Sequence, residues 1–187
     1  MKRALISLGA AVFSAFALFT AAPSAFAATT LVLTVPGVQG SSTVQGFSND
    51  IDIHAFSFDV SETVLSGPGG GGVSGKPDFS QLVITKSADR ADVPLLAREL
   101  SGTVIPHAQI DVLESAESGH RQVVSQVILT NVEIADIASG VSKGSVGTVT
   151  IKLAFRKIEF LTNIYDPSGK LVSTERVSYD VSLNKIL

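Results

Sequence analysis

The chain has 187 residues, contains no cysteine and carries a net charge of −3. Without cysteine it forms no disulfide, no thiolate metal site and no thiol nucleophile. The weak negative charge, with no run of lysine and arginine, argues against nucleic acid and against an anionic membrane surface as partners.

The first 27 residues have the three parts of a secretory signal peptide. Lys2 and Arg3 form a basic start, residues 4–19 form an apolar run, and Ala25-Phe26-Ala27 places small residues where a signal peptidase cleaves. The alternative is an uncleaved membrane anchor, but the run is short for a helix that spans a bilayer. We expect cleavage after Ala27 and a secreted or periplasmic protein without a further membrane span. Removal of Lys2 and Arg3 takes the net charge from −3 to −5.

Residues 28–187 suit a single domain, and most of them have the pattern of β-strands. Residues 31–35 form a first run, which ends at Pro36-Gly37. Residues 51–60 form a second, in which the apolar alternation slips by one position near Ala55 and Phe56. Side-chain direction repeats every two residues, so the slip indicates a bulge or a strand buried on both faces. Further strands are predicted over residues 79–85, 108–112, 123–137, 149–165 (with a slip near Arg156) and 171–181.

Two segments interrupt the strands. Residues 92–102 are predicted to form a short helix, because Pro94 suits a first helical turn and Gly102 suits a C-terminal stop. Asp166-Pro167-Ser168-Gly169 is typical of a turn and predicts a terminal hairpin. The chain is therefore predicted to be mainly β, as a barrel of about seven to nine strands whose open end or edge is covered by one short α-helix.

Residues 66–75 include six glycines, yet they do not form a phosphate-binding loop. The P-loop pattern is absent, and Pro77, which follows Gly75-Lys76, has no N–H to donate. No helix follows whose N-terminus could hold an anion.

The sequence gives no positive case for an enzyme. His54, His107 and His120 lack the spacing of metal ligands, and Asp50, Asp52 and Asp59 do not form a calcium-binding loop. Glu114 and Glu117 lie in a polar segment, where carboxylates are most often simply solvated. We predict no catalytic residue, no metal and no cofactor.

Several segments, in order, resemble the Hcp family of type VI secretion. The similarity covers nearly all of residues 28–187, and each motif alone is weak, whereas their order and spacing are specific. The closest match is the Gly-rich stretch followed by residues 75–86. The other matching segments are residues 31–41, residues 51–61, Asp89, Pro94-Leu95-Leu96, Gly102, residues 155–160 and residues 177–180.

The resemblance implies a flattened β-barrel with one helix that assembles into a hexameric ring. Rings of this family stack into a hollow tube that leaves the cell and carries effector proteins as cargo. The long loop after the second strand resembles the stacking element of the family. In this chain it corresponds to Ser66, Gly67, Gly69, Gly70, Gly71, Gly72, Val73, Ser74 and Gly75.

The chain departs from the family in two respects. Members normally assemble in the cytoplasm without a signal peptide, and the common glycine after the aromatic residue of the second strand is Asp59 here. We expect a structural, self-assembling protein. The alternative is an exported monomeric binding module that has the same fold and no role in type VI secretion.

Overall fold

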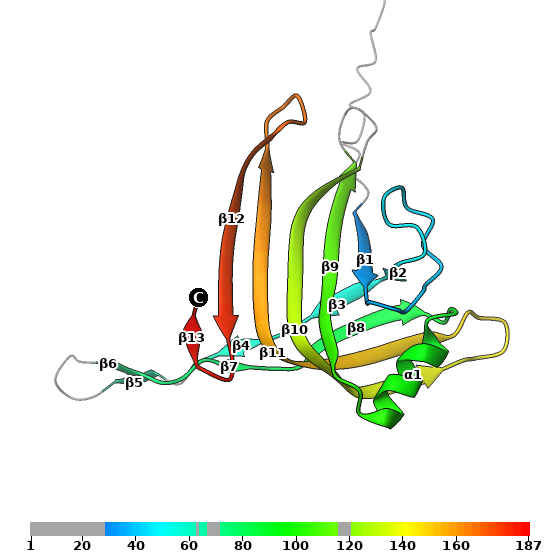
Figure 1. The fold of residues 1–187 in the computed structure, drawn as a ribbon, viewed down its shortest axis with the longest axis horizontal. Helices are drawn as coiled ribbons and strands as arrows, with labels where there is room; N and C mark the ends of the chain where they lie inside the picture. Colours follow the sequence, from blue (N-terminus) through cyan, green and yellow to red (C-terminus); the bar gives the residue numbers. More distant parts are fainter. Residues whose placement is uncertain (1–28, 63, 67–71, 116–120) are drawn as a thin grey trace, which may run out of the picture.

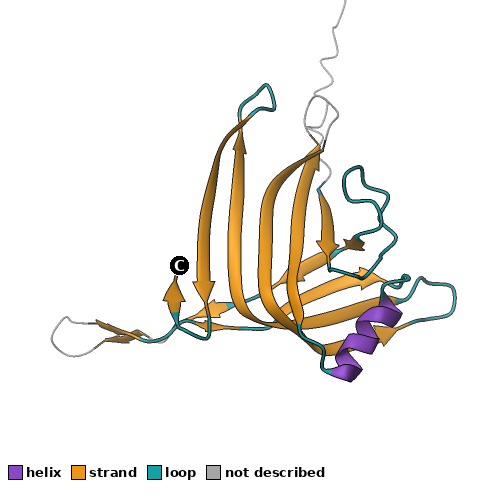
Figure 2. Ribbon diagram, viewed as in Figure 1, coloured by secondary structure: helices purple, strands orange, loops and turns teal. Residues whose placement is uncertain are grey.

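The structure is a computed structural model that describes residues 29–62, 64–66, 72–115 and 121–187. The expected signal peptide, residues 1–27, lies outside the described residues. Figure 1 and Figure 2 show a strongly curved sheet, the helix beside it and a narrow hairpin that projects from the base of the sheet. Among the described residues, no helix is both long enough and apolar enough to cross a bilayer.

Nine strands form the main sheet, and four short strands form two separate pairs. The main sheet contains β1 (Thr30–Thr34), β2 (Ile51–Ile53), β3 (Ala55–Ser57), β8 (Leu82–Ser87), β9 (Ile105–Ser115), β10 (Arg121–Gly140), β11 (Thr148–Tyr165), β12 (Leu171–Asp180) and β13 (Lys185–Ile186). The pairs are β4 (Val60–Ser61) with β7 (Asp78–Phe79), and β5 (Val64–Ser66) with β6 (Gly72–Ser74).

The main sheet curls until β2 and β3 lie on either side of His54, while β12 and β13 continue from β11 outside this curl. Its antiparallel order runs β13-β12-β11-β10-β9-β1-β2, and β3 pairs with β8, which pairs with β11. His54 alone separates β2 from β3, and its N–H donates to the Thr85 carbonyl at 2.8 Å. The chain itself, through His54, thus connects β2 to β3, and the curled sheet has the shape of a flattened barrel. The predicted mainly β fold with one helix is confirmed.

Both predicted slips in the apolar alternation mark places where a strand changes its direction. The first coincides with the break at His54, after which Phe56 packs against the core. At the second, Leu153 and Ile158 are both buried although they are five positions apart. Between them, Arg156 lies opposite Asn131, which has a positive φ of 51°. These bends let the long strands follow the curve of the barrel.

Among the described residues, the single helix, α1 (Asp92–Ser101), covers an edge of β10 with which no strand pairs. β9 pairs with β10 only as far as Val132, so the following residues of β10 lack a partner on that side. Leu95 of α1 is buried, and the Ile137 N–H donates to the Glu99 carboxylate at 3.2 Å. Gly102 ends α1 with a positive φ of 60°. The predicted helix is confirmed, and it lies at an edge, which is one of the two positions expected for it.

Candidate assembly surfaces

The predicted stacking loop belongs to the hairpin that projects from the barrel. Ser66 lies in β5, Gly72, Val73 and Ser74 lie in β6, and Gly75 follows β6. The ladder between β5 and β6 pairs Val64 with Ser74 and Ser66 with Gly72. Figure 1 shows this hairpin extending away from the sheet. Gly67, Gly69, Gly70 and Gly71 lie outside the described residues, and the stacking role remains a prediction.

The base of the hairpin is fixed to the barrel by aromatic packing. The Phe79 ring lies 5.0 Å from the Tyr179 ring and 6.2 Å from the Phe155 ring, measured between centroids. The Asp59 N–H donates to Ser80 Oγ at 2.7 Å, and the Ser80 N–H donates to the Asp59 carbonyl at 2.9 Å. The Asp59 side chain is exposed, so the charge that replaces the family glycine faces solvent at the root of the hairpin.

One long edge of the sheet is open. β12 pairs with β11 on one side, whereas on its other side β13 pairs only with Tyr179 and Asp180. Within the described part of the chain, residues 171–177 of this outer edge have no strand partner, and the Ser178 carbonyl accepts from the Leu187 N–H at 3.0 Å. Three apolar side chains of the strand are exposed: Leu171 by 48%, Val172 by 64% and Val177 by 48%. Open edges of this length form β-ladders with other chains unless they are blocked.

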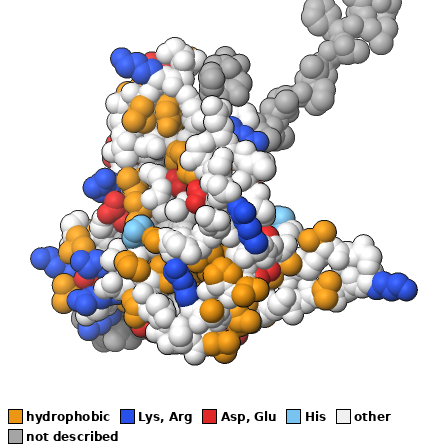
Figure 3. All heavy atoms as spheres, turned by 45° about the vertical axis from the view of Figure 1, so that its right-hand side comes forward, with side chains coloured by type: hydrophobic (Ala, Val, Ile, Leu, Met, Phe, Trp, Pro, Cys, Tyr) orange, Lys and Arg blue, Asp and Glu red, His pale blue; other side chains and the backbone are white. Residues whose placement is uncertain are grey.

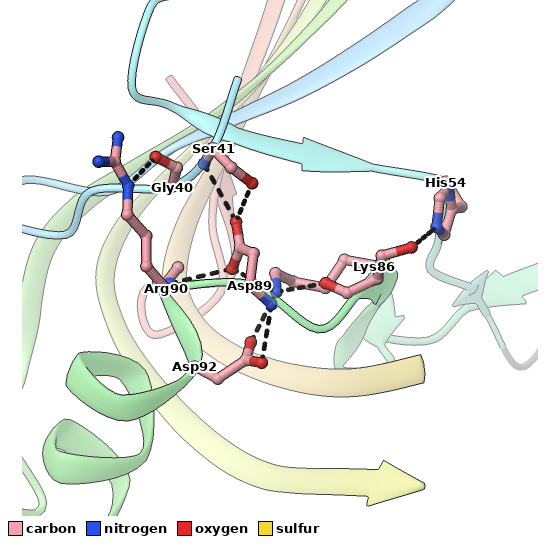
Figure 4. A network of polar contacts seen from close by, with 9 residues as sticks. Gly40, Ser41, His54, Lys86, Asp89, Arg90 and Asp92 are labelled. Carbon is pink, nitrogen blue, oxygen red and sulfur yellow. Dashed lines mark hydrogen bonds and ion pairs between the residues drawn. The ribbon is translucent and has the colours of Figure 1, made fainter. Parts of the chain in front are cut away.

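A buried lysine organises the junction between β8 and α1 (Figure 4). Lys86 has no exposed surface, and its Nζ lies 2.7 Å from Asp89 Oδ1 and 2.6 Å from Asp92 Oδ1. It also donates to the Ser87 carbonyl at 2.7 Å. Three acceptors therefore replace the water that the ammonium group lost on burial.

The same junction holds the loop between β1 and β2. The Ser41 N–H and hydroxyl donate to Asp89 Oδ2 at 3.2 and 3.0 Å. Arg90 donates to the Gly40 carbonyl and, at 2.6 Å, to Asn49 Oδ1. Burial opposes the ionisation of Asp89, but hydrogen bonds from Lys86, the Ala91 N–H and Ser41 outweigh it and hold the pKa of Asp89 below its usual range. The junction is a structural anchor for this end of the barrel.

A second buried carboxylate, Asp111 of β9, has amide partners and no cationic partner among the described residues. Gln109 Nε2 donates to both of its oxygens at 2.9 Å, and Gln126 Nε2 donates to Oδ1 at 2.6 Å. Asp50 lies close enough for the two charges to interact. Partial burial raises the pKa of Asp50, the charge of Asp111 adds to this rise, and a hydrogen bond with Thr34 opposes it.

The polar residues considered as candidates for chemistry do not converge. His54 Nε2 lies 2.8 Å from Ser87 Oγ, His107 is exposed on β9, and His120 lies outside the described residues. Glu114 lines an open pocket at the end of β9, and Glu117 also lies outside the described residues. In the part of the chain that the structure describes, no three histidine, aspartate or glutamate side chains gather as a metal site.

Sequence reasoning missed the Lys86 junction. Leu82, Ile84 and Lys86 share one parity of β8, and all three are fully buried. The sequence signal for this junction was a lysine at a core position of a strand, followed by Asp89 and Asp92. A buried ammonium group requires anionic partners.

Taken together, these features define a class of β-barrel protein with an open strand edge and a projecting hairpin. The family model described as "Type VI secretion system effector, Hcp" matches residues 32–161. The chain therefore belongs to the Hcp family, as the ordered motifs predicted.

Solved structures described as type VI secretion or Hcp proteins have the same fold. Hcp1 from Salmonella typhimurium is 20% identical, with a TM-score of 0.70 over 86% of this chain and 99% of that one. A type VI secretion system effector from Yersinia pestis is 19% identical, with a TM-score of 0.63 over 81% of this chain and 99% of that one. A structure described as a type six secretion system protein is 21% identical, with a TM-score of 0.77 over 86% of this chain and 100% of that one. No curated protein matches the sequence.

Proposed function

We propose that the chain is a structural protein of the Hcp type, which assembles into hexameric rings that stack into a tube. The match to the Hcp family over residues 32–161 carries this proposal. The open edge of β12 supports it, since self-association satisfies backbone groups that the single chain leaves without a strand partner in the described residues. The tube would have an effector protein as its cargo.

The contact that builds the ring is heterologous. The open edge lies on the β12 side of the sheet, whereas the opposite side ends in β1 and β2. A contact between two different surfaces forms a ring when the rotation between neighbours closes. The hairpin that contains Ser66 to Gly75 is proposed to contact the next ring.

The proposal includes export by the general secretory route. Lys2, Arg3 and Ala25-Phe26-Ala27 support a signal peptide over residues 1–27. Expression of the full chain in an exporting bacterial host, followed by mass spectrometry of the product, tests this. The expected product begins at Ala28 and is found outside the cytoplasm. A cytoplasmic product that retains residues 1–27 contradicts export and leaves the ring proposal untouched.

Light scattering and negative-stain imaging of the exported protein test the assembly. We expect ring particles, and we expect Val177→Lys to weaken them, because a lysine on an open edge opposes pairing with another strand. Val141→Lys is the matched control, since Val141 is exposed by 79% and lies in the loop between β10 and β11. A strict monomer that binds a specific surface component would instead support the monomeric binding module.

A further inference from the structure

The amino group of Lys86 lies in a dry part of the fold. Its side chain has no exposed surface, whereas every other lysine of the described residues is at least partly exposed. Figure 3 shows lysine and arginine side chains standing on the outside of the molecule, which is their usual position. Leu82 and Ile84 precede Lys86 on the same face of β8, and Val149 lies opposite it in β11. All three are buried, so apolar side chains surround the strand position of this lysine.

Two carboxylates meet this amino group, and they are held in different ways (Figure 4). Asp92 Oδ1 lies 2.6 Å from Lys86 Nζ, and Asp92 Oδ2 accepts a hydrogen bond from the Asp89 N–H at 3.0 Å. Asp89 Oδ1 lies 2.7 Å from Nζ and accepts from the Ala91 N–H at 3.0 Å, while Asp89 Oδ2 accepts from Ser41. Asp89 is thus fixed by several donors, whereas Asp92 presents its Cγ to the lysine with a backbone N–H at Oδ2.

We propose that Lys86 Nζ and Asp92 Cγ join in an intramolecular amide bond, an isopeptide cross-link, with Asp89 as the proton acceptor. The amide closes a loop of the chain and ties β8 covalently to the first residue of α1. Exported proteins commonly use disulfides to restrain the unfolded chain, and this sequence has no cysteine. The cross-link supplies such a restraint, and it depends neither on the proposed ring nor on a second protein.

The reaction balances without an outside reagent. A proton moves from Lys86 Nζ to Asp92 Oδ1, which leaves an amine beside a carboxylic acid. The Nζ lone pair attacks Asp92 Cγ, a C–N bond forms, and the Asp89 N–H stabilises the negative charge that develops on Oδ2. Asp89 Oδ1 accepts a second proton from Nζ and passes it to the hydroxyl group on Asp92. The bond from Cγ to Oδ1 breaks, one water leaves, and Oδ2 becomes the carbonyl oxygen of the amide.

The contact geometry and the burial of the site favour this condensation. Groups that a fold holds in contact react as if their concentration were about 10⁵–10⁸ M, which overcomes the cost of forming an amide. The side chains of Lys86 and Asp89 are exposed by only 0% and 10%, and a neutral amide costs less to bury than an ion pair. The Asp92 side chain is exposed by 28%, which gives the departing water a route to solvent.

Intact-mass spectrometry of the exported full-length protein tests the bond. The wild type should be lighter by about 18 Da, the mass of one water, than the sequence that begins at its own measured N-terminus. Trypsin cuts after Arg90, and the two peptides on either side of this cut should stay joined through Lys86 and Asp92. A wild type of full mass, or tryptic peptides that separate at Arg90, overturns the inference.

Single substitutions assign the lost water to this site. Lys86→Met and Asp92→Ala should each restore the full mass, and Asp89→Asn should restore it in most molecules because the proton acceptor is gone. Lys152→Met is the control: Lys152 Nζ also contacts a carboxylate, Asp136, at 3.1 Å, but both side chains are nearly half exposed. The loss of one water should persist in this control.

A water loss that survives Lys86→Met or Asp92→Ala comes from another site and overturns the inference. Complete reaction in Asp89→Asn refutes the role of Asp89. If Lys86→Met does not fold, the joined tryptic peptides of the wild type decide the question without it.

Discussion

Lys86 Nζ lies 2.6 Å from Asp92 Oδ1, although the Lys86 side chain has no exposed surface and Asp92 is the first residue of α1. The pair joins β8 to the helix, and Asp89 extends the junction to Ser41 in the loop after β1. One buried cation thus joins two neighbouring elements, and Asp89 connects them to a loop that is distant in the sequence.

Removing Lys86 should destabilise the fold strongly. Lys86→Met leaves two carboxylates without their cation in a largely dry site, and breaking a buried pair in this way costs about 3–5 kcal/mol. Urea denaturation of the folded protein measures the change in the free energy of unfolding. Lys152→Met is the control, because Lys152 and Asp136 are both nearly half exposed and such pairs contribute about 0–1 kcal/mol. Equal effects of the two substitutions would contradict a special role for the junction.

Asp89 should make stability fall in acid. Its pKa is lower in the fold than its ordinary value of 3.8, so its contribution is present above 3.8 and is lost as pH falls through the lower folded pKa. The difference in unfolding free energy between the wild type and Asp89→Asn should therefore be largest near neutral pH and shrink in acid. Denaturant titrations across the acidic range measure it, and a difference that does not change with pH would refute the assignment.

The contribution of Asp50 to stability should depend on pH in the opposite direction to that of Asp89. Its folded pKa is raised above 3.8, so the contribution of its protonated form is present below 3.8 and is lost as pH rises through the folded pKa. Asp50→Asn removes the repulsion from Asp111 and keeps an oxygen that accepts a hydrogen bond from Thr34. We expect a melting temperature at neutral pH that is equal to or above that of the wild type, with the gain fading in acid. A clear loss of stability at neutral pH would count against this reading.

Gly40 should tolerate no side chain. A Cβ at this position would meet the Asp50 carbonyl oxygen at 2.3 Å and the Ile51 Cα at 2.6 Å, and both are backbone atoms. Gly40→Ala should therefore destabilise the protein by about 1–3 kcal/mol, the range of overpacked sites. At Gly140, a Cβ would meet nothing within 4 Å. Thermal melting of both variants measures the effect, and Gly140→Ala should leave the melting temperature unchanged. An unchanged melting temperature of Gly40→Ala would show that the loop after β1 moves to accept a side chain.

Local patterns in the sequence were sufficient to predict much of the fold. Pro94 and Gly102 bounded the helix, the Asp166 turn located the last hairpin, and both slips in apolar alternation correspond to bends in strands. The link from the Lys86 junction to Ser41 and the Asp50–Asp111 pair depend on contacts between residues far apart in the chain, which local periodicity does not encode. The groove lined by Val104, Phe155 and Val181 was equally hidden, because it arises where β8 and β12 pair with different parts of one edge of β11.

The mass of the exported wild-type protein in solution tests the central claim most directly. Light scattering coupled to size exclusion should show a discrete particle of six copies that persists on dilution, and negative-stain images of the same fractions should show rings. A protein that remains a single copy at the highest accessible concentration, with no ring in the images, would contradict the account.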